Sequence, residues 1–166
     1  GYQAWTKTLG NGMSREWVFA QFVSLPEFAA TCKALGMEVG TYQTHDPRDE
    51  NIQATGFINR LYRTCLDRKG EKDGVNAWVS VLNKKTQSPK QIAHGFVFSK
   101  EFIAKNYNNT DYVKQLYRAL MGREFDTAGL AAWVKTLDNG TMTREQVFNG
   151  FVNSPEFAAI IRSFGL

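Results

Sequence analysis

Few side chains in this sequence have the types and spacing that catalysis requires. The only histidines are His45 and His94, and neither stands in a recognisable nucleophilic triad. Asp46 and Glu50 could be imagined as the two carboxylates that a glycosidase uses as acid and base. No phosphate-binding loop and no pair of metal-binding histidines accompanies them. The sequence therefore predicts a protein that is not an enzyme and uses no cofactor.

Three acids in one turn have the oxygen chemistry that calcium prefers. Asp67, Glu71 and Asp73 precede Gly74, but their spacing is not that of an EF-hand loop. Asp and Gly are also the ordinary residues of a turn that ends a helix. We therefore predict no metal site and keep these three acids as weak candidates.

Aromatic and acidic residues near the beginning of the chain suggest a ligand site. Trp17 stands at a polar helix-capping position that faces water, where two later segments have Gln91 and Gln146. Sugars are commonly held by an aromatic face together with fixed polar groups. We therefore predict that a ligand contacts the following residues: Trp17, Tyr42, His45, Asp46 and Asp49.

These residues are carried by a sequence that repeats itself. Residues 112–157 align without a gap with residues 57–102 at a shift of 55 positions. A third copy opens the chain but has only its back half, in which Trp5 matches Trp133 and Phe28 matches Phe157. Internal repetition predicts the architecture more strongly than any other signal. The expected units are a half-repeat (residues 1–37), an unrepeated link (38–54), a second repeat (55–105) and a third repeat (106–166).

Each full repeat predicts four short helices and no strand. Apolar residues recur every four positions in residues 56–66, and Thr55 and Thr110 are the expected N-caps of the first helix. Two capping boxes open the third helix, Ser88 with Gln91 and Thr143 with Gln146. The predicted fold class is all-α, with tandem repeats of about four short helices packed into one compact or solenoid-like body.

Residues that recur in every copy are expected to serve the scaffold. An arginine and a glutamate recur as Arg68 with Glu101 and Arg123 with Glu156, which suggests an Arg–Glu pair. The recurrent tryptophans Trp5, Trp78 and Trp133 fall on the apolar face of the second helix. Cys32 and Cys65 occupy core-type positions, so we expect two small buried residues, with a disulfide as the alternative.

The net charge of +4 is unevenly distributed. Residues 57–105 carry ten Lys or Arg against four Asp or Glu. The favoured interpretation is a set of solvated helix faces, and the alternative is attraction of an anionic polymer. No segment is long and apolar enough to span a membrane.

A set of residues in the third repeat matches a known family pattern: Leu116, Tyr117, Arg118, Gly122, Arg123, Asp126, Gly129, Trp133, Phe151, Ser154, Glu156 and Phe157. The pattern resembles a bacterial family known as domain of unknown function 4214. The second repeat departs from it, with Asp67 in place of Gly122 and Glu71 in place of Asp126. The resemblance implies an extracellular or cell-surface module, similar to parts of surface-layer proteins, adhesins and secreted glycan-active proteins. It implies no catalytic residues.

The resulting hypothesis is a non-catalytic binding module of a secreted or cell-surface bacterial protein. Its expected ligand is a carbohydrate or cell-envelope glycan, with a role in adhesion. The alternative is a structural protein-interaction or surface-assembly module without a small ligand. An electrostatic partner such as teichoic acid or nucleic acid ranks third. Because the sequence starts inside a repeat, we expect a fragment of a larger protein.

Overall fold

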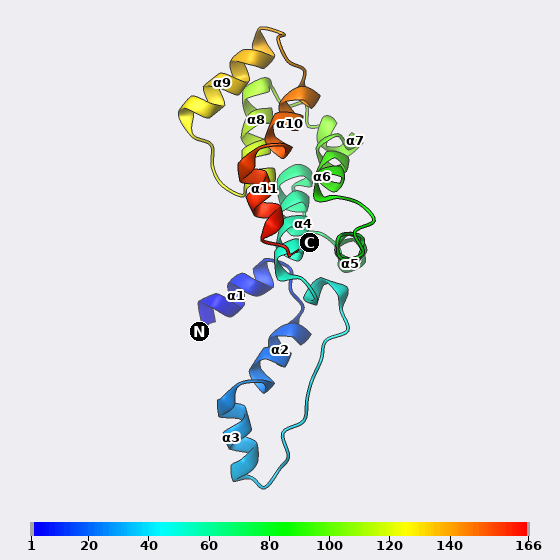
Figure 1. Ribbon diagram of the computed structural model, residues 1–166, viewed down its shortest axis with the longest axis vertical. Coiled ribbons are helices and arrows are strands. Elements are labelled where there is room, and N and C mark those ends of the chain that lie inside the picture. The colour runs from blue at the N-terminus through cyan, green and yellow to red at the C-terminus, as the bar shows by residue number, and fades with distance from the viewer. Residues whose placement is uncertain (1, 166) are drawn as a thin grey trace.

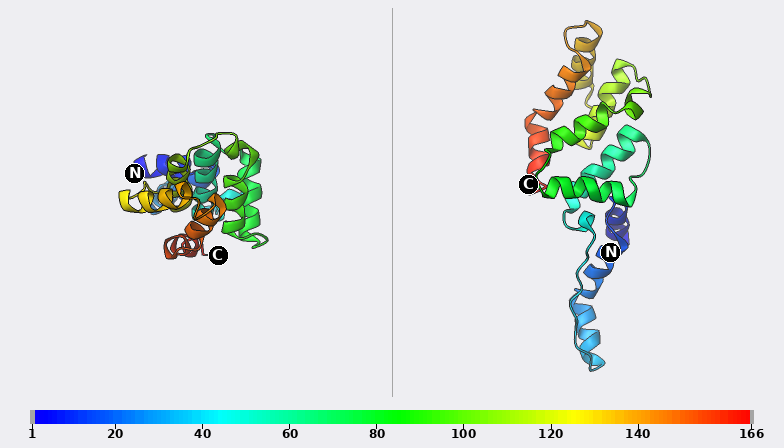
Figure 2. Two further views of the ribbon diagram at one scale, coloured as in Figure 1. Left: turned by 90° about the horizontal axis from the view of Figure 1, so that it is seen from above. Right: turned by 90° about the vertical axis from the view of Figure 1, so that its right-hand side faces the viewer.

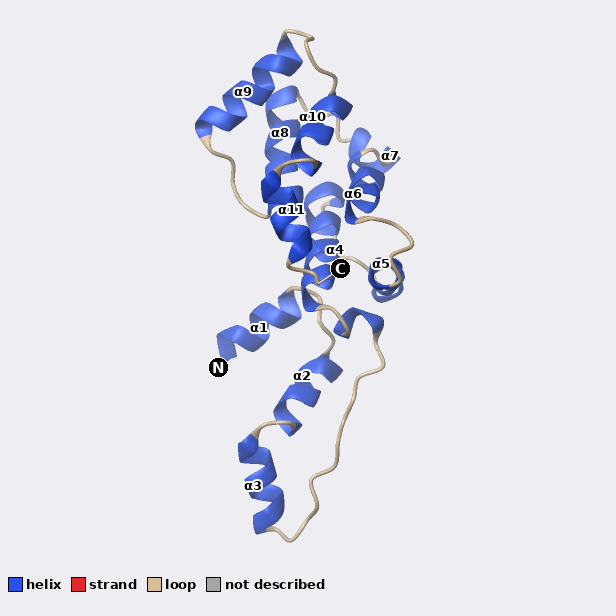
Figure 3. Ribbon diagram, in the orientation of Figure 1, coloured by secondary structure: helices blue, strands red, loops and turns tan. Residues whose placement is uncertain are grey.

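The computed structural model describes residues 2–165, and every regular element in that range is a helix (Figure 3). The half-repeat contains α1 (Tyr2–Gly10), α2 (Arg15–Val23) and α3 (Pro26–Ala34), and the link contains the 3₁₀ helix η1 (Pro47–Asp49). The second repeat contains α4 (Ile52–Leu66), α5 (Lys72–Asn83), α6 (Pro89–Val97) and α7 (Lys100–Ile103). The third contains α8 (Asn109–Leu116), the π-helical turn η2 (Tyr117–Met121), α9 (Thr127–Asp138), α10 (Arg144–Val152) and α11 (Pro155–Arg162). The all-α, tandem-repeat fold class is confirmed.

The starts of the helices test the predicted caps. The two capping boxes, Ser88 with Gln91 and Thr143 with Gln146, are both present. The predicted caps Thr55 and Thr110 are wrong, because asparagines cap these helices earlier. Asn51 accepts a hydrogen bond from the Ala54 N–H, and Asn108 accepts one from the Asp111 N–H. Thr55 is buried inside α4 and donates its hydroxyl to the Arg48 carbonyl at 2.6 Å.

The second and third repeats share one core. Its buried members lie between Ala54 and Phe164, and α4 packs against helices of both repeats. Phe57 of α4 contacts Phe157 of α11, with ring centroids 6.2 Å apart, and also contacts Phe164 at 5.4 Å. The two repeats therefore form one body that neither could complete alone.

The half-repeat projects from this body. In Figures 1 and 2, α2 and α3 extend away from α4, and the link runs back beside them. Among the described residues 2–165, the main core contains no residue of the half-repeat. Two contacts anchor its turn after α1: Arg63 donates to the Gly10 carbonyl, and Gly12 lies against Asn59 with a φ of 103°. A side chain at Gly12 would collide with Asn59, so this approach requires glycine.

Both cysteines are buried and free, as the repeat register predicts. Cys65 is fully buried in α4, and burial raises the pKa of its thiol to about 12. The disulfide alternative is therefore wrong for this structure.

Candidate functional site

Each full repeat contains a row of five side chains, here called the Trp–Glu row. In the third repeat, Trp133 packs against Phe151 with centroids 5.3 Å apart, and Tyr117 meets the same Phe151 edge-on at 4.9 Å. The Arg123 guanidinium lies over the Tyr117 ring, 5.1 Å from its centroid. Arg123 then donates to both carboxylate oxygens of Glu156, at 2.6 and 2.9 Å. The second repeat has the same row, formed by Trp78, Phe96, Tyr62, Arg68 and Glu101.

This row confirms the predicted Arg–Glu pairs. The hydrogen bonds from Arg123 hold the pKa of Glu156 below its usual range, and the same bonds raise the pKa of Arg123. The row also accounts for a recurrent glycine. A Cβ on Gly129 would lie 2.3 Å from the Tyr117 hydroxyl, and one on Gly74 would lie 2.7 Å from the Tyr62 hydroxyl. Tyrosine and glycine are thus required together in each full repeat.

The half-repeat contains only part of this row. Trp5 packs against Phe22 at 5.0 Å, as Trp133 packs against Phe151. Glu27 stands exposed at the start of α3, in the register of Glu156. Residues 2–37, the described part of the half-repeat, include no helix equivalent to α4 or α8 and so supply neither the tyrosine nor the arginine. Its row therefore has the tryptophan, the phenylalanine and the glutamate but lacks the tyrosine and the arginine.

Within residues 2–165, three phenylalanines of the half-repeat are more exposed than their counterparts in the third repeat. Phe19, Phe22 and Phe28 are 53%, 47% and 40% exposed. Their counterparts in the third repeat are 2%, 3% and 0% exposed, namely Phe148, Phe151 and Phe157. We call Phe19, Phe22 and Phe28 the aromatic face. It lies on α2 and α3, in the projecting part of the molecule (Figure 1).

The predicted ligand residues lie close to this face but have other contacts. Trp17 is half-buried and packs against Trp5, 6.4 Å between centroids, so the prediction of a water-facing tryptophan is wrong. Tyr42 lies edge-on against Phe19 at 5.0 Å and donates to Glu16 at 2.8 Å. That hydrogen bond raises the pKa of the Tyr42 phenol. His45 is exposed in the link.

The two predicted acceptors in the link are buried rather than presented to solvent. The Asp49 carboxylate accepts hydrogen bonds from the Ser14 N–H, at 2.9 Å, and from the Ser14 hydroxyl. Asp46 uses one oxygen, Oδ2, to pair with Arg48 Nε at 3.1 Å and Lys72 Nζ at 3.5 Å. Its other oxygen, Oδ1, is buried and has no hydrogen-bond partner. Asp49 therefore holds α2 to the link, whereas Asp46 retains an unused acceptor.

Asp46 is also one of the residues that line a polar cleft. It has a volume of about 510 Å³ and lies where the half-repeat, the link and the second repeat meet. Asp46 lines it together with Glu16, the hydrogen-bond partner of Tyr42. Basic side chains outnumber acidic ones in its wall, which is formed by Leu9, Met13, Ser14, Arg15, Glu16, Asp46, Arg48, Lys69 and Lys72.

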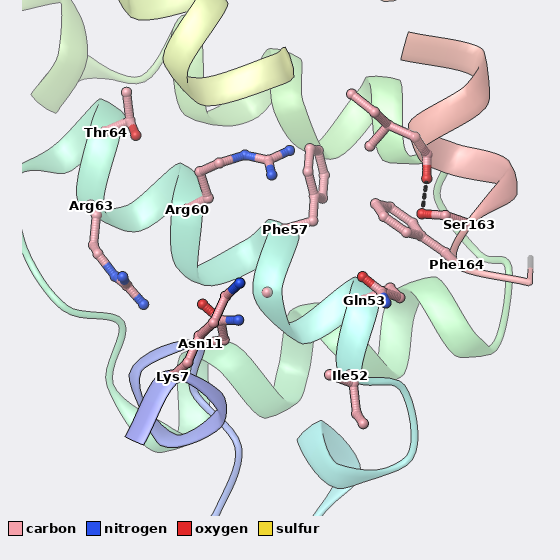
Figure 4. A pocket seen from close by; sticks show the side chains of 12 residues that line it. Lys7, Asn11, Ile52, Gln53, Phe57, Arg60, Arg63, Thr64, Ser163 and Phe164 are labelled. Carbon is pink, nitrogen blue, oxygen red and sulfur yellow. Dashed lines mark hydrogen bonds between the residues drawn. The ribbon is translucent and has the colours of Figure 1, made fainter. Parts of the chain in front are cut away.

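A second, larger cleft of about 660 Å³ runs along α4 between α1 and the end of α11 (Figure 4). Lys7 of α1 and Arg63 of α4 lie at one end of it, and Phe164 lies at the other. Arg60 lines the cleft but donates to the carbonyls of Ala119 and Leu120, and burial lowers its pKa. The hydrogen-bonding groups of Arg60 are thus used at the end of η2. No sequence signal points to this cleft.

Two of the three weak metal candidates, Asp67 and Glu71, pair with cationic side chains of the protein. Asp67 ends α4 in a left-handed conformation, with φ 50°, and pairs with Lys105. Both oxygens of Glu71 accept from Arg68, at 2.8 and 2.9 Å, while Asp73 is exposed in α5. Within residues 2–165, no three His, Cys, Asp or Glu side chains are grouped to hold a metal ion.

Asp46 and Glu50, considered above as an acid–base pair, contact different partners. Asp46 pairs with Arg48, whereas Glu50 accepts from the Asn83 amide at 2.9 Å. His94 lies against Phe98 and approaches Glu145 at 3.4 Å. Across the described part of the chain, no helix has the length and apolar character needed to cross a membrane.

The aromatic face is the feature that sequence reasoning missed, although a signal for it was present. Phe22 and Phe28 align with core phenylalanines of the full repeats, yet the half-repeat lacks the helix that would cover them. An apolar pattern without its covering element predicts an exposed face.

Comparison with known families identifies the repeats. The profile of the family described as domain of unknown function (DUF4214) matches twice, over residues 45–106 and 93–161. Neither match includes the half-repeat, so its kinship with the other copies rests on sequence register and on the contact between Trp5 and Phe22. Searches of curated proteins and of solved structures found no match. Because the two matches together span most of the chain and fall on the repeated Trp–Glu rows, the chain belongs to the DUF4214 family.

Proposed function

We propose that the chain is a non-catalytic interaction module that assembles with another protein through the aromatic face of its half-repeat. The observation that carries the proposal is the contrast in exposure between equivalent phenylalanines. Phe22 is 47% exposed where Phe151 is 3% exposed. Within residues 2–165, a position that is buried in the third repeat is thus exposed in the half-repeat.

The composition of the surface favours a protein partner over a small ligand. Phe19, Phe22 and Phe28 lie on two successive helices, and Leu35 and Met37 extend the apolar surface beyond the end of α3. Groups of exposed apolar side chains can mark interaction sites, and aromatic residues are enriched in the centres of such sites. The resemblance to modules of surface-layer proteins and adhesins supports an extracellular or cell-surface setting for this assembly.

A photo-crosslinking experiment tests the proposal. A benzophenone amino acid replaces Phe22 in one variant and exposed Lys84 in another, and both are irradiated in the cells that make the protein. We expect crosslinks to protein from position 22 and not from position 84, since Lys84 is the exposed C-cap of α5 and lies outside the half-repeat. Absence of protein crosslinks from position 22, in a variant whose circular dichroism matches wild type, would contradict the proposal.

A second candidate function is binding of a glycan in the polar cleft of about 510 Å³. The specific observation that favours it is the composition of the cleft wall, where basic side chains surround the buried carboxylate of Asp46. These basic side chains favour an anionic sugar. Glu16 lines the same cleft, and Tyr42 donates a hydrogen bond to Glu16.

Binding to a glycan panel separates the two functions. Wild type is compared with Asp46→Asn, Tyr42→Ala and Trp17→Ala, each checked by circular dichroism. Glycan binding is expected to be lost in Asp46→Asn and retained in Glu38→Gln, a control at an exposed acid of the link. No binding by wild type, or full retention in all three variants, would eliminate the glycan function.

A further inference from the structure

We infer that the aromatic face is the acceptor site for one kind of element, a helix of the Leu-Tyr-Arg type from a partner segment outside residues 1–166. This inference rests on the proposed function and names the partner's chemistry. The incoming helix would do for the half-repeat what α4 and the α8–η2 helix do for the full repeats.

The first support is the state of the row in the half-repeat. Its tryptophan and phenylalanine are already packed together, since Trp5 and Phe22 lie 5.0 Å apart. In both full repeats the next member is a tyrosine that meets the phenylalanine edge-on at 4.9 Å. The half-repeat presents the phenylalanine surface for such a ring but has none of its own.

The second support is charge. Glu27 occupies the register of Glu101 and Glu156, which accept hydrogen bonds from Arg68 at 3.2 Å and from Arg123 at 2.6 Å. Each of these arginines belongs to the segment that follows the Leu-Tyr-Arg helix. An acidic group at Glu27, beside an apolar surface, therefore matches an arginine at a fixed place on the incoming segment.

The geometry of the full repeats specifies the partner closely. In each, the tyrosine is followed five residues later by a left-handed residue, Asp67 with φ 50° or Gly122 with φ 68°, that ends the helix. The arginine comes directly after it, which places it six residues after the tyrosine. The expected partner sequence is Leu-Tyr-Arg, three residues, a Gly or Asp, and then Arg.

A second copy of this chain is a poorer occupant. Its own Tyr62 and Tyr117 are 6% and 5% exposed and packed in its core, so they could reach the aromatic face only if a folded repeat opened. A simple dimer through two aromatic faces would leave Glu27 without an arginine of the required spacing. Measuring the oligomeric state of the protein tests whether a second copy occupies the aromatic face.

The probe is a synthetic peptide with the sequence of residues 106–125 of this chain, added to the whole protein. Binding is followed by tryptophan fluorescence and by amide NMR shifts, which should move in α2 and α3. Phe22→Asp is expected to weaken binding at least tenfold. Asn149→Asp, an exposed control on the equivalent helix of the third repeat, should leave it unchanged.

A charge exchange makes the test specific. Glu27→Arg should weaken binding of the native peptide, and a peptide carrying Arg123→Glu should bind the Glu27→Arg protein better than wild type. A peptide in which Tyr117 is replaced by Ala should bind neither protein. Rescue by the exchanged pair supports the inference, and equal binding in all four combinations overturns it.

Failure of this inference can be told apart from failure of the proposed function. If the peptide causes no shift in α2 or α3 at millimolar concentration, the Leu-Tyr-Arg partner is wrong. A concentration-dependent dimer that Phe22→Asp abolishes would likewise replace the peptide partner with a second copy. In both cases, protein crosslinks from position 22 would still uphold an interaction module.

Discussion

Arg123 and Glu156 meet through two nearly parallel hydrogen bonds, Nε to Oε1 at 2.6 Å and Nη2 to Oε2 at 2.9 Å. The pair joins the segment after η2 to the first turn of α11, residues that lie 33 positions apart. Glu156 also favours the positive end of α11, because it lies in the first turn of that helix. The pair is partly exposed to solvent, which screens its attraction.

Replacing Glu156 by Gln should lower the melting temperature by a few degrees at pH 7. The folded pKa of Glu156 is depressed, chiefly by its hydrogen bonds to Arg123. Its stabilisation is therefore fully present above the unfolded value, about 4.3, and is lost as pH falls through the lower folded pKa. The difference between wild type and Glu156→Gln should shrink below about pH 4. Glu38→Gln, in the exposed link, should show no such pH-dependent difference, and an equal change in both variants would contradict the assignment.

Truncation of Phe157 should destabilise the protein much more than truncation of the equivalent residue Phe28. Phe157→Ala should destabilise the protein by about 3–5 kcal/mol, because Phe157 is fully buried and its loss leaves a cavity. Phe28→Ala should cost less than about 1 kcal/mol, since its ring is 40% exposed. Urea unfolding followed by circular dichroism measures both. Similar losses in the two variants would mean that Phe28 is covered in solution.

The architecture could be predicted because its determinants are local and repeated. Ser88 with Gln91 and Thr143 with Gln146 lie three residues apart on one helix turn, so their capping boxes follow from spacing alone. The Arg–Glu pairs are distant in sequence, but their recurrence in two copies indicated a scaffold role. The match of the DUF4214 profile to both full repeats agrees with that interpretation.

The errors arose where neighbouring elements decide the environment. Thr55 has the right chemistry for an N-cap, but η1 packs against α4 and buries it, and Asn51 begins the helix instead. Asp46 and Asp49 looked like solvent-facing acceptors of a loop, whereas the link folds back and buries both. Sequence spacing within the link does not reveal which element covers it, so their burial could not be predicted.

Cys65 should be inert to thiol reagents in the native protein. Its burial in α4 raises the thiol pKa to about 12, and the thiolate is the reactive form. At pH 8, labelling with iodoacetamide should be far slower than in urea and should follow the rate of unfolding. A Cys65→Ser variant identifies the contribution of Cys32. Labelling of Cys65 as fast as in an unstructured peptide would show that α4 opens readily.

Asp49→Ala should loosen the half-repeat without unfolding the body. Asp49 accepts two hydrogen bonds from Ser14, which is the N-cap of α2, so it fixes the point at which α2 leaves the body. Its removal leaves the buried Ser14 N–H without a partner, at a cost of about 1–3 kcal/mol. Amide hydrogen exchange in residues 14–37 should therefore accelerate by roughly tenfold or more, since each 1.4 kcal/mol is a factor of ten.

The core helices α4 and α10 should keep their protection, because the half-repeat contributes nothing to their core. Glu50→Ala is the matched control, as Glu50 is the exposed neighbour whose carboxylate contacts Asn83 instead. Equal acceleration in both variants, or loss of protection in α10, would show that Asp49 does not act as a local anchor for the aromatic face.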